Sequence, residues 1–141
     1  MGIALPCATR FRQQVVLVVD DEPLIRALVS DWLFESGVAT AEAADGHDAI
    51  AYLASNPEVA LVFSDINMPG ACDGVALAAW IRSNRPDVSV ILASAQSSHE
   101  GFLPGVRFFA KPYDLKDVVH CITAELQRNN KLSAAQTLNT A

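Results

Sequence analysis

The chain is poor in cysteine, in basic residues and in long apolar runs, and each shortage excludes a class of protein. It contains 3 cysteines, an odd number without a CxxC pair, which argues against a disulfide framework or a zinc site and suits a reducing cytoplasmic location. Lys and Arg number 10 against 16 Asp and Glu, a net charge of −6, so direct binding to nucleic acid is not expected. The first residues lack a charged head followed by a long apolar core, so neither a signal peptide nor membrane insertion is expected.

What the chain does contain is a regular alternation of strand-like and helix-like segments. Hydrophobic residues make up 51% of the 141 positions, which is enough for one domain with a buried core. Short apolar, β-branched runs predict strands over residues 15–19, 38–43, 59–63, 88–93 and 106–110. The run over 38–43 is the weakest and is expected at an edge of the sheet. Helical spacing of apolar residues lies between and after these runs. The pattern predicts an α/β fold, a doubly wound five-stranded parallel sheet of flavodoxin-like order 2-1-3-4-5.

The pattern also suggests where the domain begins and ends. Residues 1–13 are expected to be a flexible leader, residues 14–128 the domain, and residues 129–141 a frayed polar tail. Gly101, Pro104 and Gly105 leave room for a shortened or irregular fourth helix only.

The first helix is expected to have Pro23 in its first turn, with one apolar face turned toward the sheet. That face comprises Leu24, Ile25, Leu28, Val29, Trp32 and Leu33.

Carboxylates follow two of the expected strands. Asp20 and Asp21 come after the first, and Asp65 after the third, which is its neighbour in the 2-1-3-4-5 order. Three carboxylates at one edge repel each other unless a cation compensates them, and oxygen ligands without His or Cys suit Mg²⁺. The alternative is that Asp20 or Asp21 only caps the following helix.

Two more strand ends carry residues suited to phosphoryl chemistry. Lys111 follows the fifth strand and offers a positive charge, and Ser94 ends the fourth and offers a hydroxyl. With a metal ion, they would neutralise charge on a phosphoryl group attacked by Asp65, giving an acyl phosphate. Taken singly, Ser94 could be just a small residue ending a strand and Lys111 a solvated charge.

Together, Asp20-Asp21, Asp65, Ser94 and Lys111-Pro112 make residues 14–128 resemble a response-regulator receiver domain of two-component signalling, in the CheY-like superfamily. The resemblance implies that Asp65 accepts phosphate from a sensor histidine kinase or a histidine phosphotransfer protein.

The same resemblance implies a ligand set and a switch. Mg²⁺ would be held by Asp21 and Asp65, with Asp20 acting largely through water and the main-chain carbonyl of Asn67 as a further ligand. The Lys111–Pro112 peptide is expected to be cis. Ser94 would pair with Phe108, the aromatic residue three positions before the lysine, as a two-state switch.

Three function classes follow from these features. The leading one is a single-domain phosphorylation switch without its own output domain, a monomer or weak dimer that acts on an unknown downstream protein. Such a domain is no enzyme in the ordinary sense, because it catalyses only its own phosphorylation and dephosphorylation. An aspartyl-phosphate hydrolase is less well supported, because the sequence has DDE after the first strand, not DxD, and no insertion large enough for a cap. A flavodoxin-like binding module lacks support, because no Gly-rich phosphate loop follows that strand.

Overall fold

The computed structural model describes residues 14–95, 103 and 105–140, and the side chains of 131–140 are not described. Five parallel strands form one sheet in the order β2-β1-β3-β4-β5. The elements are β1 (Val15–Val19), α2 (Pro23–Glu35), β2 (Ala39–Ala43), α3 (Gly46–Ser55), β3 (Val59–Asp65), α4 (Gly74–Asn84), β4 (Ser89–Ser94), β5 (Arg107–Ala110) and α5 (Leu115–Thr140). The predicted fold class and strand order are therefore confirmed.

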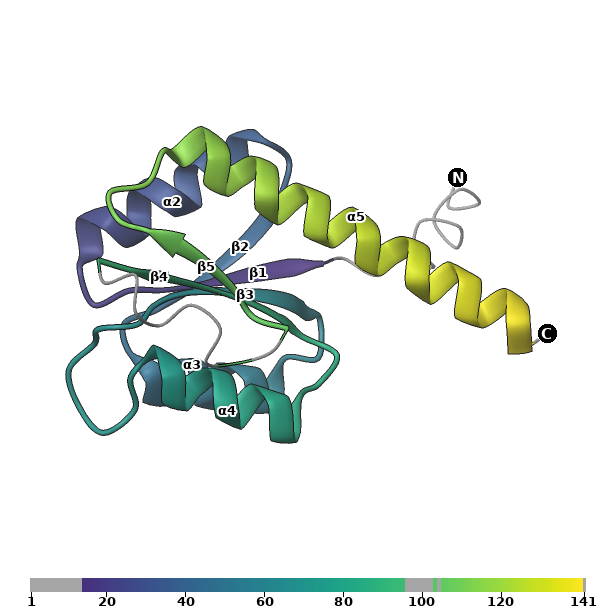
Figure 1. Cartoon of the computed structure of the whole chain (residues 1–141), viewed down its shortest axis with the longest axis horizontal. Helices are drawn as coiled ribbons and strands as arrows, with labels where there is room; N and C mark the ends of the chain where they lie inside the picture. Colours follow the sequence, from purple (N-terminus) through teal and green to yellow (C-terminus); the bar gives the residue numbers. More distant parts are fainter. Residues whose placement is uncertain (1–13, 96–102, 104, 141) are drawn as a thin grey trace, which may run out of the picture.

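Helices cover both faces of this sheet. Figure 1 shows α2 and α5 on one face and α3 and α4 on the other. Alternate residues of the central strands divide between two cores: Val16 and Val18 pack toward α2 and α5, whereas Leu17 and Val19 pack toward α3 and α4. The central strands are thus apolar on both faces, which is why their runs in the sequence show no polar alternation.

Local signals explain where three of the helices begin. The Asp45 side chain accepts a hydrogen bond from the Asp48 N–H at 2.9 Å, and the Asp73 side chain accepts one from the Ala76 N–H at 2.9 Å. The side chain of Asp114 accepts in the same way from Lys116. Each carboxylate satisfies a backbone donor that the first turn leaves unpaired.

Only half of the predicted inward face of α2 is turned toward the sheet, so this prediction is corrected. Val29 and Leu33 are buried and Ile25 is half-buried, but Leu24, Leu28 and Trp32 are exposed by 85%, 46% and 39%. The buried residues form one row along the helix and the exposed residues form a second row, about 100° away around the helix axis. A helix that packs on a flat sheet buries one of these rows and leaves the other in solvent. Leu24, Leu28 and Trp32 are called the apolar row of α2 below.

The expected frayed tail is also corrected. Helix α5 continues to Thr140 and extends past the end of the sheet (Figure 1). Residues 129–140 contain no Gly or Pro, so nothing in them stops a helix once it has started. The Asn129 amide also donates to the Ser89 hydroxyl at 3.0 Å, and the Asn130 amide donates to the Gln14 side chain at 3.1 Å.

Two sequence predictions lie outside the described residues. They are the flexible leader over 1–13 and most of the shortened fourth helix, which falls on 96–102 and 104. In the described part of the chain, no helix is long and apolar enough to cross a membrane.

Candidate functional site: an acidic pocket at the strand ends

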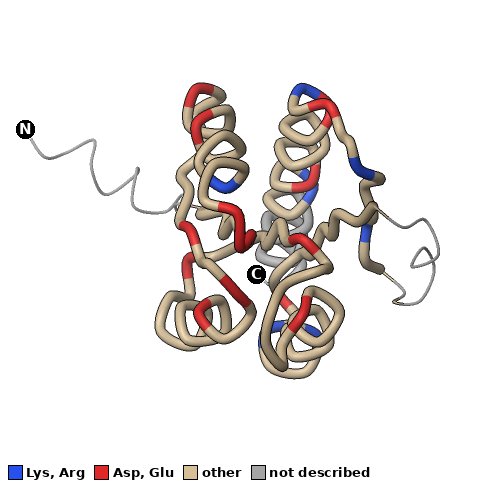
Figure 2. The backbone as a smooth tube through the Cα atoms, turned by 90° about the vertical axis from the view of Figure 1, so that its left-hand side faces the viewer, with Lys and Arg blue, Asp and Glu red and all other residues tan. Residues whose placement is uncertain are grey.

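Three carboxylates meet where β1 and β3 end. Asp20 and Asp21 follow β1 and Asp65 is the last residue of β3; one oxygen atom from each lies within 4.8 Å of the others. Asp20 and Asp65 are buried, at 5% and 7% exposure, whereas Asp21 is exposed. Figure 2 faces this edge and shows acidic positions near the middle of the view. The sequence-based grouping of these residues is therefore what the fold produces.

The carboxyl group of Asp20 is electrostatically strained in this position. Burial raises its pKa, and the neighbouring charges of Asp65 and Asp21 act in the same direction. A hydrogen bond of 2.9 Å from the Glu22 N–H and the charge of Lys111 act in the opposite direction. Oxygen donors that are crowded, partly buried and incompletely compensated fit a hard divalent cation such as Mg²⁺.

Neither aspartate after β1 is the helix cap that the alternative reading proposed. Glu22 occupies the N-cap position of α2, and its side chain makes no capping hydrogen bond. Asp20 bonds to the Glu22 N–H, which fixes the turn before the helix and holds the carboxylate toward Asp65.

Lys111 reaches this pocket from the end of β5. Its Nζ lies 3.1 Å from the Asp65 Oδ2 atom, and its backbone N–H donates to the Ser94 carbonyl at 2.9 Å. The Lys111–Pro112 peptide is cis, as the family resemblance implied. The opposite oxygen of Asp65, Oδ1, accepts a long hydrogen bond of 3.3 Å from the Asn67 N–H. Asp65 is thus fixed from two sides.

Ser94 and Phe108 lie on the same face of the sheet. Ser94 is buried at the end of β4, where it pairs with Ala110, and Phe108 pairs with Leu92 two residues earlier. Phe108 is half-buried and packs against the core under α3 and α4. Side chains two residues apart on a strand share a face, so the serine hydroxyl and the phenyl ring project to the same side.

Two residues that the sequence reading did not single out also shape the pocket. A Cβ atom added to Gly74, the first residue of α4, would lie 2.5 Å from the Asp65 carbonyl oxygen and 2.6 Å from the Ile66 Cα atom. Its N–H donates to the Ile66 carbonyl at 2.9 Å. Only glycine therefore lets α4 start against the backbone at the end of β3. A glycine directly after a helix-capping aspartate was the signal available in the sequence.

Tyr113 is the second missed residue. Its ring packs edge-on against Phe63, with centroids 5.7 Å apart. Burial raises the pKa of its hydroxyl to about 12, and the charges of Asp20, Asp65 and Glu22 add to that rise. An aromatic residue two positions after Lys111 could not be assigned to the pocket without the path of the loop between β5 and α5.

Known proteins resemble this chain in sequence and in structure. The family model of the response regulator receiver domain matches residues 16–123. The transcriptional regulatory protein PrrA of Mycobacterium tuberculosis is 33% identical over 127 residues, which cover 86% of this chain and 54% of PrrA. The DNA-binding transcriptional regulator NtrC of Salmonella typhimurium is 33% identical over 111 residues, covering 74% of this chain and 23% of NtrC. The chain thus spans about half of PrrA and less of NtrC.

A solved structure supports the same relationship. The response regulator protein TrrA from Thermotoga maritima, crystallised in complex with Mg²⁺ and BeF, superposes with a TM-score of 0.71 at 30% identity, covering 79% of this chain and 98% of TrrA. Sequence, strand order and the converging strand ends agree with one another. The chain belongs to the family of response regulator receiver domains.

Proposed function

We propose that Asp65 is the phosphoacceptor of a signalling switch and takes its phosphoryl group from a histidine kinase or a histidine phosphotransfer protein. One observation carries the proposal: the Asp65 carboxylate lies 3.1 Å from the Lys111 ammonium and within 4.8 Å of the Asp20 and Asp21 oxygens. In the transfer, an Asp65 oxygen bonds to phosphorus while the bond from phosphorus to the donor's imidazole nitrogen breaks. The electron pair stays on that nitrogen. Because the other ring nitrogen of the phosphohistidine carries a proton, the donor leaves as neutral histidine, and no oxidant or other co-reactant is needed.

The side chains around Asp65 take separate roles in this proposal. Asp20, Asp21, Asp65 and the main-chain carbonyl of Asn67 would hold Mg²⁺, and the ion supplies charge neutralisation for the phosphoryl oxygens. Lys111 compensates the acceptor carboxylate before transfer and a phosphoryl oxygen after it.

The same phosphoryl group gives a route to the signal. Ser94 ends the strand next to Asp65, and its hydroxyl would donate to a phosphoryl oxygen. Phe108, on the same face and only half-buried, would then turn into the space that the hydroxyl leaves. A local hydrogen bond thereby biases a two-state side chain whose ring borders the surface at β5.

The apolar row of α2 supports a docking site for the phosphodonor. Helix α2 begins three residues after Asp20, so its exposed Leu24 lies in the first turn after the acidic pocket, and the exposed Leu28 follows one turn farther along. Exposed large apolar side chains next to a functional site are typical of a protein-binding surface. The sequence-based expectations that the chain lacks an output domain and is a monomer or weak dimer stay predictions.

The acceptor can be tested with a small donor that needs no docking. We expect acetyl phosphate with Mg²⁺ to add one phosphoryl group, detected by intact mass, and Asp65→Asn to abolish the addition. Asp31→Asn is the matched control, because it removes an exposed carboxylate on α2, outside the pocket. This variant should gain one phosphoryl group, as the wild type does. Labelling that persists in Asp65→Asn would remove Asp65 from the proposed role.

The docking part of the proposal has its own test. Leu28→Glu should slow transfer from a phosphohistidine donor protein and leave labelling by acetyl phosphate unchanged. Equal slowing with both donors would mean that the substitution damages the pocket, and the docking assignment would then be wrong.

A further inference from the structure

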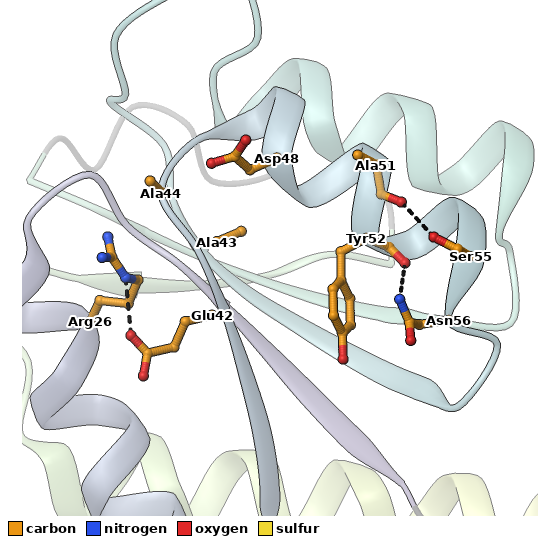
Figure 3. A pocket seen from close by; sticks show the side chains of 9 residues that line it. All are labelled: Arg26, Glu42, Ala43, Ala44, Asp48, Ala51, Tyr52, Ser55 and Asn56. Carbon is orange, nitrogen blue, oxygen red and sulfur yellow. Dashed lines mark hydrogen bonds and ion pairs between the residues drawn. The ribbon is translucent and has the colours of Figure 1, made fainter.

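A hollow of about 440 Å³ lies along the outer edge of β2 (Figure 3). Asp20, Asp21, Asp65 and Lys111 of the acidic pocket are not among the residues that line it. Arg26 borders it from α2, Asp48 and Tyr52 border it from α3, and Glu42 and Ala43 of β2 lie between them. Because α2 and α3 cover opposite faces of the sheet, the hollow lies over the open edge of the strand. A molecule that fills it would therefore lie in the plane of the sheet.

The edge of β2 is suited to accept another strand. Within the described part of the chain, β2 pairs with β1 alone, which leaves the backbone groups of its outer edge without a strand partner. Its sequence is ATAEA, so small side chains alternate along the edge and Glu42 is the only long one. An open strand edge with little steric cover is a template for an extended peptide, whose main-chain groups complete the hydrogen-bond ladder.

The charges of the hollow indicate which peptide would fit. Glu42 and Asp48 contribute two carboxylates, and Arg26 contributes one guanidinium group. Arg26 is engaged with Glu42, from Nε to Oε1 at 3.1 Å, whereas Asp48 makes no ion pair with any described residue. One negative charge is left uncompensated, and the whole chain is acidic as well. A basic side chain is the complement.

We propose that the open edge of β2 docks an extended segment of a partner protein, with a lysine or arginine side chain directed to Asp48 and Glu42. The main chain of that segment pairs with β2, and the alanines of the hollow leave room for its side chains. This surface is separate from the apolar row of α2, which offers large apolar side chains and no open backbone edge.

Arg26 connects this edge to the acidic pocket. Its Nη1 atom donates to the main-chain carbonyl of Asp20 at 2.6 Å, while its Nε atom bonds to Glu42. A basic residue that competes for Glu42 alters the hold of Arg26 on the Asp20 turn. Because coupling between two binding sites is reciprocal, the state of the acidic pocket changes the affinity for the segment by the same factor. This coupling rests on the proposed function; the docking does not.

Docking can be measured by fluorescence anisotropy with the full chain. The probes are labelled octapeptides of alternating valine and threonine with a central lysine, and the same peptide with glutamate in that place. Two further forms of the lysine peptide are N-methylated at alternate residues, one along each edge of the extended peptide. We expect the lysine peptide to bind about tenfold more tightly than the glutamate peptide. We expect the peptide methylated on the side that faces β2 to lose binding, because it cannot donate to the strand.

Protein variants localise the binding. Asp48→Lys should weaken the lysine peptide about tenfold. Asp117→Lys, which reverses an acidic charge in the first turn of a different helix, is the matched control and should bind as wild type does. Absence of binding by every peptide, equal binding of both methylated forms, or an equal loss in the control overturns the proposal. A dimer of the chain that Asp48→Lys dissociates would assign the edge to a second copy and overturn it too.

The coupling is measured separately. Mg²⁺ with beryllofluoride should change the affinity for the lysine peptide at least about threefold in the wild type and leave it unchanged in Arg26→Gln. An unchanged affinity in the wild type overturns the coupling and leaves the docking in place. Failure of Asp65 to be labelled would refute the proposed function without affecting the docking result, so the two are distinguishable.

Discussion

Neutralising Asp20 is expected to stabilise the metal-free protein and to weaken its response to Mg²⁺. The oxygens of Asp20 and Asp65 lie within 4.8 Å of each other. At an effective dielectric constant of about 20, two unit charges about 5 Å apart repel by about 3 kcal/mol. Lys111 and local relaxation offset much of this repulsion, so we expect Asp20→Asn to raise the free energy of unfolding by about 1 kcal/mol in EDTA. Asparagine keeps an oxygen that can accept the bond from the Glu22 N–H, so that contact is retained.

Adding Mg²⁺ should cancel or reverse this difference in the free energy of unfolding between Asp20→Asn and the wild type. A ligand at about 100 times its dissociation constant stabilises the folded state by about 2.7 kcal/mol, and at about 10 times by about 1.4 kcal/mol. If Asp20→Asn lowers the affinity about tenfold, its gain in EDTA is offset when Mg²⁺ is added. Thermal unfolding followed by circular dichroism resolves these effects, because about 1 kcal/mol corresponds to about 4 °C in a domain of this size.

The pH dependence of stability gives an independent test of whether Asp20→Asn stabilises the protein. The folded-state pKa of Asp20 is raised by burial above its ordinary value, so its ionised form costs stability, and this cost appears as the pH rises from about 4. The advantage of Asp20→Asn in EDTA should therefore be present at pH 7 and shrink on acidification. Asp31→Asn controls for the loss of one charge. An Asp20→Asn variant that is less stable than wild type in EDTA at pH 7 would refute the reasoning.

Three further outcomes are expected. Lys111→Ala should leave the Mg²⁺ affinity, measured by fluorescence titration, mostly intact. It should uncouple the labelling of Asp65 from the rearrangement of Phe108 that NMR detects. An equal loss of Mg²⁺ affinity would mean that Lys111 has a structural role. Gly74→Ala should destabilise the protein by about 2–4 kcal/mol, because its Cβ meets backbone at 2.5 Å, and a cost near zero in urea unfolding would contradict this. Tyr113, with its pKa raised to about 12, should remain protonated in an ultraviolet titration at pH 11, and its raised pKa should lower stability as the pH rises above 10; ionisation near pH 10 would place its ring in water.

The acidic pocket could be predicted because its parts are tied to strand ends. Asp20, Asp65 and Lys111 each follow a short apolar run, and the carboxyl ends of parallel strands lie at one edge whatever the details of packing. The strand order then decides which ends are neighbours. The sequence by itself therefore determined the sheet, the direction of its strands and the identity of the residues that converge.

Only the tertiary structure decided the features that depend on how a helix is turned about its axis and on the path of a loop. The apolar residues of α2 span two rows, and only packing against the sheet selects Val29 and Leu33 over Leu24 and Leu28. Tyr113 reaches the pocket through the loop after β5, whose path no local pattern encodes. Periodicity fixes the spacing along one element, whereas the contact between two elements depends on how both are turned, and that is settled only when they pack together.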